Sequence, residues 1–316
     1  MNNSPFHAGE IAMQQAAGSA ARLREIGPRV IRYHMPDQHR EFFEQLPTLL
    51  VGSVDAQQRP WASMLAGLPG FIETPDARHL RIAARPHAAD PLQAELRAGT
   101  ALGLLGIEPQ TRRRNRVNGT IVGVDDGGFE VRVDQSFGNC PKYIQARTPQ
   151  WVERAATASS SRPEGPRLSD AAARLVAQAD TFFIATAAPG QGVDVSHRGG
   201  KPGFVRLEQR DSATVLTAPD FIGNFFFNTL GNIVANPRAG LLFVDHDGGG
   251  LLQLTGHARI VADGADVAAF TGAQRLLRIE VAAGWWTPGA LPLRWSTPEF
   301  ASQLGGTGNW PAHDTV

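Results

Sequence analysis

The sequence predicts a mainly β protein with some helix, built as two tandem β-barrels behind N-terminal helices. Three observations lead to this prediction. From Thr48 onward, short β-rich runs separated by turn signals follow one another across about 90 residues, as in a barrel or sandwich. The second half of the chain repeats the first half in order. The first 47 residues carry no such β pattern and are helix-prone instead.

Residues 1–47 form the first predicted unit, an arm followed by helices. The alanine-rich segment 11–26 predicts one helix that stops at Gly27-Pro28, and DQHREFFEQL at 37–46 predicts a second helix that ends before Pro47. His7 and Glu10 have a spacing that would allow both to bind a metal from one helix face. Because no third ligand is nearby in sequence, we expect no metal site there.

Residues 48–150 and 171–316 form two copies of one barrel, and the Ser-, Pro- and Arg-rich segment 151–170 is the predicted linker. TLLV at 48–51 corresponds to TFFI at 181–184, and the PGF at 69–71 recurs at 202–204, both 133 positions later. GLL at 103–105 recurs at 240–242, and Gly119 corresponds to Gly256, both 137 positions later. One loop insertion of four residues explains the change, so the series indicates a duplication.

Composition excludes several classes of protein. Thirty basic residues balance thirty acidic ones, so no basic field marks a nucleic-acid binder, and the basic run at 111–116 is interpreted as a solvated strand edge. The single cysteine, Cys140, excludes an intramolecular disulfide and a cysteine zinc cage, and we expect a packed structural thiol. No apolar run of about 18 residues and no signal core are present, which predicts a cytoplasmic protein without a membrane span.

The two copies differ where chemistry is expected. The second copy has a glycine-rich basic turn, SHRGGK at 196–201, whereas the first copy has SMLAGL at 63–68. Exposed glycine backbone beside Arg and Lys suits an anionic phosphate or a flat ring, although a solvated loop is the alternative interpretation. If one copy holds an anionic cofactor, we expect it to be the second.

Other chemistries find less support. Ser196 and His197 are adjacent in a strand and therefore point to opposite faces, and no G-x-S-x-G elbow is present, so hydrolysis is not expected. No G-x-G-x-x-G opens a helix after a strand, which argues against a Rossmann nicotinamide site. The sequence assigns no catalytic residue.

With the repeat established, the second half resembles the pyridoxamine 5′-phosphate oxidase-related family of flavin-binding split β-barrels. The resemblance rests on the order GFVRL, TVLTA, PDFIGN, NTLGNIVANP, AGLLFVD and LLQLTGHARIV. In the first half, QSFGNCPKYIQAR at 135–147 is similar to the Cys-Pro-Lys segment after the last barrel strand in these proteins. SPFHAGE and HMPDQHREFF resemble the leader of long bacterial members, some of which are fused to reductase modules.

The resemblance implies a flavin mononucleotide (FMN, or FAD) at a homodimer interface. By position, 203–207 resembles the strand beside the ring and 217–224 the phosphate loop, but Gly223-Asn224 stands where the biosynthetic oxidase has Arg-Lys. The phosphate charge is therefore assigned to Arg198 and Lys201. A helix over 224–236 would place three asparagines on one face, as ribityl contacts or as exposed polar positions and caps. The candidate cofactor-binding residues are Ser196, His197, Arg198, Lys201, Gly203, Phe204, Val205, Arg206, Thr217, Asn224, Asn228 and Asn232.

The function that the resemblance implies is an FMN-dependent oxidoreductase acting on a small-molecule substrate, with NAD(P)H or a reductase partner as electron donor. Counterparts of the oxidase's substrate-clamping Arg and His are missing, so activity on pyridoxamine phosphate is not expected. We expect a homodimer, because a split barrel buries its free edge by pairing. The alternatives are a non-catalytic flavin- or haem-binding or storage protein, and a barrel that binds no cofactor.

Overall fold

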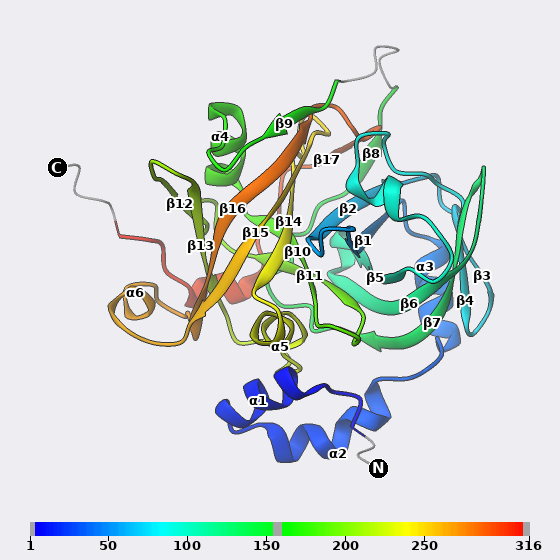
Figure 1. The fold of residues 1–316 in the computed structure, drawn as a ribbon, viewed down its shortest axis with the longest axis horizontal. Helices are drawn as coiled ribbons and strands as arrows, with labels where there is room; N and C mark the ends of the chain where they lie inside the picture. Colours follow the sequence, from blue (N-terminus) through cyan, green and yellow to red (C-terminus); the bar gives the residue numbers. More distant parts are fainter. Residues whose placement is uncertain (1–3, 154–159, 312–316) are drawn as a thin grey trace.

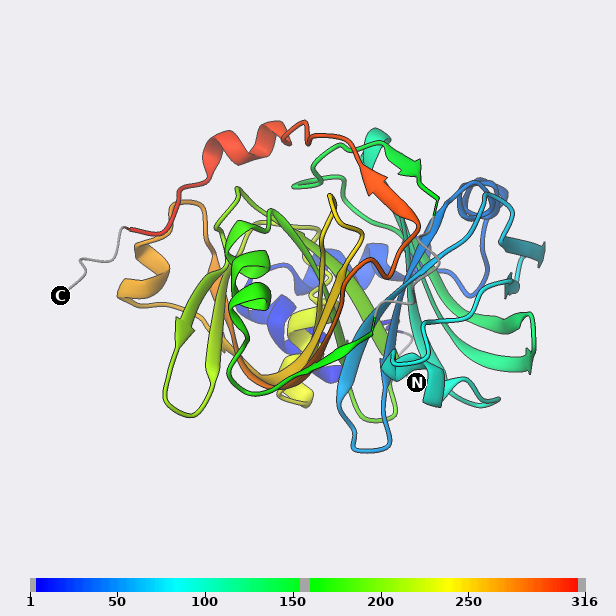
Figure 2. The same cartoon turned by 90° about the horizontal axis from the view of Figure 1, so that it is seen from above.

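A computed structural model describes residues 4–153 and 160–311 and shows two β-sheets, one from each half of the chain, side by side (Figures 1 and 2). The first sheet has the strand order β2-β1-β5-β6-β7-β4-β3. Its strands are β1 Thr48–Val54, β2 Pro60–Ala66, β3 Ile72–Asp76, β4 His79–Ile82, β5 Ala101–Glu108, β6 Arg113–Asp125 and β7 Gly128–Gly138.

The second sheet repeats this topology strand for strand, in the order β11-β10-β14-β15-β16-β13-β12. Its strands are β10 Thr181–Ala187, β11 Val193–Gly199, β12 Arg206–Gln209, β13 Thr214–Asp220, β14 Arg238–Val244, β15 Leu251–Val261 and β16 Arg275–Thr287. The predicted fold class, mainly β with two tandem barrel copies, is therefore confirmed.

Both copies contain a shift in strand register at equivalent positions. In the first copy the β6–β7 register shifts between Asn118 and Gly119, and in the second the β15–β16 register shifts between Thr255 and Gly256. A Cβ on either glycine would collide with the facing strand's carbonyl oxygen, of Arg132 or of Glu280. The repeated glycine thus marks a β-bulge that only a residue without a side chain fits.

The two copies pack against each other about an approximate twofold axis. A Cβ on Gly103 of β5 would lie 2.6 Å from the Val193 carbonyl oxygen of β11, and one on Gly240 of β14 would collide with the equivalent oxygen of Pro60 on β2. Apolar side chains of both copies join in one cluster around this contact, including Leu50, Met64, Phe183 and Leu242. The chain therefore makes within itself the isologous contact that two single barrels make in a twofold dimer.

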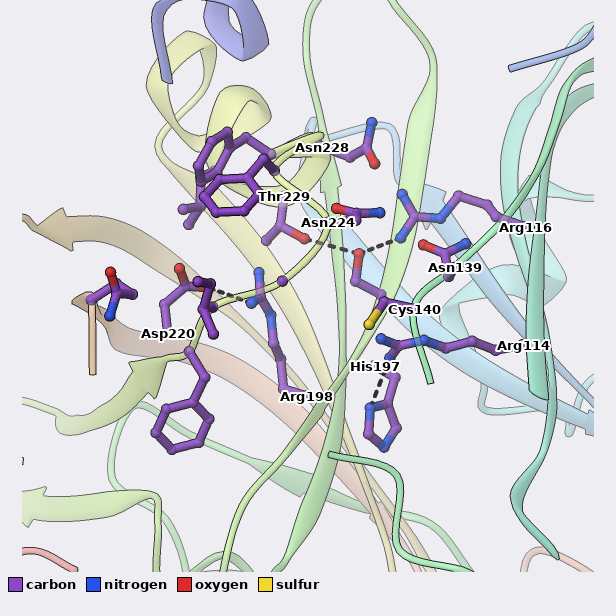
Figure 3. A pocket seen from close by; sticks show the side chains of 18 of the residues that line it. Arg114, Arg116, Asn139, Cys140, His197, Arg198, Asp220, Asn224, Asn228 and Thr229 are labelled. Carbon is purple, nitrogen blue, oxygen red and sulfur yellow. Dashed lines mark hydrogen bonds and ion pairs between the residues drawn. The ribbon is translucent and has the colours of Figure 1, made fainter. Parts of the chain in front are cut away.

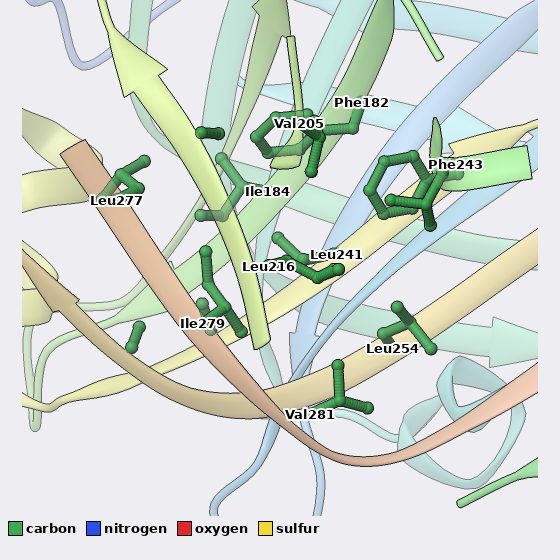
Figure 4. Close-up of a cluster of buried hydrophobic side chains, with 14 of the residues drawn as sticks. Phe182, Ile184, Val205, Leu216, Leu241, Phe243, Leu254, Leu277, Ile279 and Val281 are labelled. Carbon is green, nitrogen blue, oxygen red and sulfur yellow. The ribbon is translucent and has the colours of Figure 1, made fainter. Parts of the chain in front are cut away.

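Each barrel also has its own apolar core. Phe42, Leu80 and Phe129 belong to that of the first, and the core of the second includes Phe182, Leu216 and Ile279 (Figure 4). These cores exclude water on the inner sheet faces and fix the strands on which the functional residues stand.

The helices of the N-terminal segment begin and end at other residues than predicted. The predicted single helix is two helices, α1 Ala8–Ala16 and α2 Ala20–Val30, separated at Gly18, whose φ of +66° a helix does not accept. Pro28 does not stop α2 at once, since the helix runs two residues further and ends at Val30. Pro28 has no N–H to donate to the carbonyl oxygen four residues earlier, and the helix ends within one turn of it. The next predicted helix is present as α3 Asp37–Glu44.

Three further helices lie in the second half: α4 Asp170–Gln178, α5 Asn228–Ala235 and α6 Ala265–Ala268. Helix α1 lies against α5 (Figure 1) so closely that a Cβ on Gly9 would collide with the Gly231 carbonyl oxygen. The predicted helix over 224–236 starts late, because Phe225 and Phe227 have φ of +66° and +63°, outside the helical region.

The segment predicted as a linker contains a short strand, β9 Arg162–Glu164, that pairs with β16, and residues 154–159 lie outside the described residues. Just before it, β8 Pro149–Trp151 pairs with β17 Leu293–Trp295. Three 3₁₀ turns complete the described elements: Pro91–Glu95, Pro109–Thr111 and Ser302–Gly306. In the described part of the chain, no helix is long and apolar enough to cross a membrane.

We predict that Gly103→Ala lowers the melting temperature by several degrees, because the added methyl group overlaps backbone of the other copy and costs about 1–3 kcal/mol. Gly123→Ala is the matched control, since a Cβ there lies 3.9 Å from its nearest neighbour. Thermal unfolding followed by circular dichroism measures both. Equal melting temperatures of the two variants would contradict the close contact between the copies.

Candidate functional site

A pocket of about 780 Å³, open mouth included, lies where the first copy meets β11 and the start of α5 (Figure 3). The first copy contributes Leu105, Arg114, Arg116, Asn139 and Cys140. The second copy contributes Ser196–Arg198, Asp220–Phe225, Phe227–Leu230, Gln274 and Arg275.

Arg116 reaches from β6 of the first copy into the second. Its Nη1 donates to Asp194 Oδ1 at 2.8 Å and its Nη2 to Ser196 Oγ at 2.5 Å, and Thr229 Oγ1 lies 2.9 Å from the same hydroxyl. The residue is only 3% exposed. The interpretation of 111–116 as a solvated strand edge is therefore wrong for Arg116, because the second copy covers that part of β6.

The pocket carries an excess of positive charge. Arg198 and Arg275 both pair with Asp220, and Arg116 pairs with Asp194. Arg114 adds a fourth guanidinium, so four cations face two carboxylates. The Nε groups of Arg114, Arg116 and Arg198 and the Asn139 amide nitrogen are buried and have no hydrogen-bond partner in the part of the chain that the structure describes. Buried donors left unpaired are costly, so this arrangement fits an anionic ligand.

His197 is held neutral beside these cations. Arg114 Nη1 donates to its Nδ1 at 3.0 Å, so the ring proton lies on Nε2. Burial, then the charges of Arg114, Arg198 and Arg147, lowers the pKa of His197 well below its usual value. The imidazole accordingly serves as an acceptor that orients Arg114, not as a cation.

A polar network under the pocket connects it to the N-terminal leader. Asn232 on α5 donates to Asp194 Oδ2 at 2.9 Å, and its Oδ1 lies 2.9 Å from His7 Nε2. His7 Nδ1 accepts the backbone N–H of Gly9, so its Nε2 carries the proton and donates to Asn232. His7 of the N-terminal segment is thus linked to Arg116 by successive hydrogen bonds through Asn232 and Asp194.

Glu10 is the second leader residue in this network. Its carboxylate accepts hydrogen bonds from the pocket residue Asn228 and from the backbone N–H of His7. Burial, assisted by the nearby Asp194 carboxylate, raises the pKa of Glu10 to about 8. His7 and Glu10 form a capping box at the start of α1. Among the described residues, no three His, Cys, Asp or Glu side chains are close enough to hold a metal ion.

The mouth is bounded by a strained aromatic segment. Phe225 and Phe227 both adopt left-handed backbone, and Tyr143, which packs on the lining residue Phe221, does the same with φ of +65°. Left-handed backbone at bulky residues costs of order 1 kcal/mol or more each and is concentrated at ligand sites. The Arg275 guanidinium lies 5.1 Å from the Phe227 ring centroid, which fixes that ring at the pocket.

The sequence-predicted residues divide into two groups. Ser196, His197, Arg198, Asn224 and Asn228 line the pocket, and Asn232 lies one layer beneath it.

The remaining candidates lie elsewhere. Lys201 donates to the Thr307 carbonyl oxygen at 2.6 Å, and Arg206 stacks on Trp310 and pairs with Glu208. Gly203 occupies a turn with φ of +83°, and Thr217 is fully buried beside Arg278. Phe204 and Val205 belong to the second barrel's core, where Figure 4 shows Val205 beside Phe182.

Sequence reasoning missed several residues that line the pocket, among them every residue from the first copy. The polar ones include Arg114, Arg116, Asn139, Cys140, Thr229 and Arg275. The basic run at 111–116 was the only sequence signal for Arg114 and Arg116, and it does not indicate that the other copy covers these residues. Cys140 was expected to be a packed structural thiol, but it lines the pocket (Figure 3).

The approximate twofold axis relates this pocket to a second position, where buried polar side chains take the place of a pocket. Strand register equates Arg116 with Gln253, since they pair with Leu105 and Leu242, and the repeat equates Ser196 with Ser63. Gln253 Nε2 donates to Ser63 Oγ and to Asp90 Oδ2, both at 3.1 Å, and Ser63 donates to Asp90 at 2.6 Å. These side chains are buried and satisfy one another, so the duplication retains one cationic site.

Comparison with known proteins identifies the family. The profile described as pyridoxamine 5′-phosphate oxidase matches residues 35–160 and again 168–284. The chain belongs to the pyridoxamine 5′-phosphate oxidase family. Within this family it carries two tandem copies of the fold, and the resemblance found in the sequence is confirmed. A search of curated proteins finds no relative.

Several solved structures are similar over one copy. HupZ from Group A Streptococcus is 17% identical, covers 36% of this chain and 89% of its own, and has a TM-score of 0.29. HutZ, the haem storage protein from Vibrio cholerae, is 13% identical over 39% and 96%, with a TM-score of 0.27. A pyridoxamine 5′-phosphate oxidase-related, FMN binding protein from Nostoc punctiforme is 11% identical over 44% and 100%, with a TM-score of 0.27.

The raised pKa of Glu10 predicts a pH-dependent stability that Glu10→Gln removes. In the unfolded chain Glu10 titrates near 4.5, and in the folded chain near 8, so unfolding releases a proton between these values. Stability of the native protein therefore falls as pH rises from about 4.5 to about 8 and levels off above. Melting temperatures from pH 5 to 9 should fall more steeply for the native protein than for Glu10→Gln. Parallel profiles would contradict the buried, protonated Glu10.

Proposed function

We propose that the protein binds FMN in the pocket between its two copies. The observation that carries the proposal is the set of buried guanidinium Nε groups that have no partner in a pocket with excess positive charge. Four arginines against two carboxylates leave about two positive charges, which match a phosphate monoester at neutral pH. Membership of the family supports a flavin as the group that bears this phosphate.

The start of α5 is the place in the pocket best suited to the phosphate. Helix α5 begins at Asn228 and has no side-chain N-cap, so its first backbone N–H groups are free of a capping oxygen. Thr229, Ser196 and Arg116 converge beside it, and Arg116 Nε is buried without a partner. Helix dipole, hydroxyls and guanidinium together would hold the dianion without the Arg-Lys pair of the biosynthetic oxidase.

We propose further that the bound flavin makes this protein an oxidoreductase. The flavin supplies hydride or electron transfer, and the protein supplies position and charge. His197 is neutral and its Nδ1 is engaged by Arg114, so its role is orientation. Both sides of the pocket come from one chain, which lets a single chain form the complete site.

Anaerobic reduction separates an oxidoreductase from a storage protein. We predict that NADPH or NADH bleaches the visible absorption of the FMN-loaded protein within minutes, and that air restores it. Free FMN with the same nucleotide is the control. Flavin that binds but stays oxidised with both nucleotides, while dithionite reduces it, would favour storage.

The segment 196–201 is predicted to be a turn, but Arg198 lies on β11 and only Lys201 lies in the turn that follows the strand. Of the two, only Arg198 lines the pocket. Arg198→Ala should weaken FMN binding about tenfold or more, because one charge-assisted contact is worth about 1.5–3 kcal/mol. Asp220 keeps its second partner, Arg275, so the variant should fold. Lys201→Ala is the matched control and should bind FMN normally in a fluorescence-quenching titration. The reverse order of effects would place the ligand at the turn outside this pocket.

A further inference from the structure

A smaller recess opens beside the main pocket and shares with it Arg114, Cys140, His197, Arg198, Phe221 and Gly223. The residues that line the recess alone are Lys142, Tyr143, Gly199 and Pro219. The segment after the last strand of the first copy therefore closes this recess against the end of β13.

Arg114, Lys142 and Arg198 are the cations that line the recess; Arg198 pairs with Asp220, whereas Arg114 and Lys142 have no carboxylate partner among the described residues. Arg114 bonds only to the neutral His197, and its Nε is buried without a partner. Burial, with the charges of Arg116 and Arg198, lowers the pKa of Arg114 to about 10, and no Asp or Glu of the described chain offsets it. Lys142 lies in the same recess. A bound anion would offset this uncompensated burial of charge.

The recess also has an apolar part. The rings of Tyr143 and Phe221 pack against each other with centroids 5.0 Å apart at 34°, and Pro219 lies beside them. Tyr143 is held there in left-handed backbone, with its hydroxyl directed to the Ile222 carbonyl oxygen at 3.5 Å. A ligand that fits both parts has an anionic head and a small apolar body.

We propose that this recess binds the carboxylate of a small organic acid, which is the substrate class of the neighbouring flavin site. That the bound acid is a substrate rests on the proposed function. That the recess binds an anion rests on its lining residues alone. Lys142, which does not line the four-arginine pocket, supplies one further positive charge for a single carboxylate, and Arg114 lies between the two sites.

Benzoate is the probe, with benzamide as its neutral isostere and inorganic phosphate as the competing anion. At constant ionic strength, benzoate should shift the visible spectrum of the FMN-loaded protein saturably, and benzamide and phosphate should not. Lys142→Ala should weaken benzoate about tenfold while FMN affinity stays unchanged. Lys201→Ala is the matched lysine control and should change neither.

Three results overturn the inference: no response to benzoate, an equal response to benzamide, or tighter binding of phosphate than of benzoate. If FMN itself fails to bind, the proposed function falls. Calorimetry of benzoate into the flavin-free protein then tests the recess alone, with Lys142→Ala again expected to lose about tenfold and unchanged affinity contradicting the assignment.

Discussion

The buried ion pair between Arg116 of the first copy and Asp194 of the second holds the site together. Breaking a buried pair by removing one partner leaves an uncompensated charge and typically costs 3–5 kcal/mol, so the two copies depend on each other through it. Arg116 also orients Ser196, and Asn232 and the leader residue His7 support Asp194 from below. The N-terminal segment, α5 and both barrels are thus connected to the Arg116 guanidinium by one series of hydrogen bonds.

The duplication explains why the site is asymmetric. Two identical barrels about a twofold axis would carry two equivalent pockets. In this chain, Gln253 stands where the other pocket has Arg116, and Asp90 bonds to it and to Ser63. One position carries the arginines, and its twin carries a buried polar cluster whose members bond to one another. Joining the copies in one chain allows such divergence, which a homodimer of identical barrels does not.

The fold could be predicted from sequence because the repeat preserves register: the glycines at 119 and 256 mark the same bulge in both sheets. The site could be predicted only in part. Ser196 and Arg198 belong to a local motif that is visible in the sequence. Arg116 acts through contact with the other copy, which no local pattern records. Phe204 and Val205 were placed beside the ligand, but β12 starts only at Arg206, and both residues turn into the core.

The central claim is one phosphate-directed flavin site per chain, and calorimetry of the purified protein with FMN and with riboflavin tests it most directly. The two ligands share the ring and the ribityl chain and differ only in the phosphate. The account predicts one FMN per chain, bound at least about tenfold more tightly than riboflavin. Equal affinity for both ligands, or two FMN per chain, would contradict it.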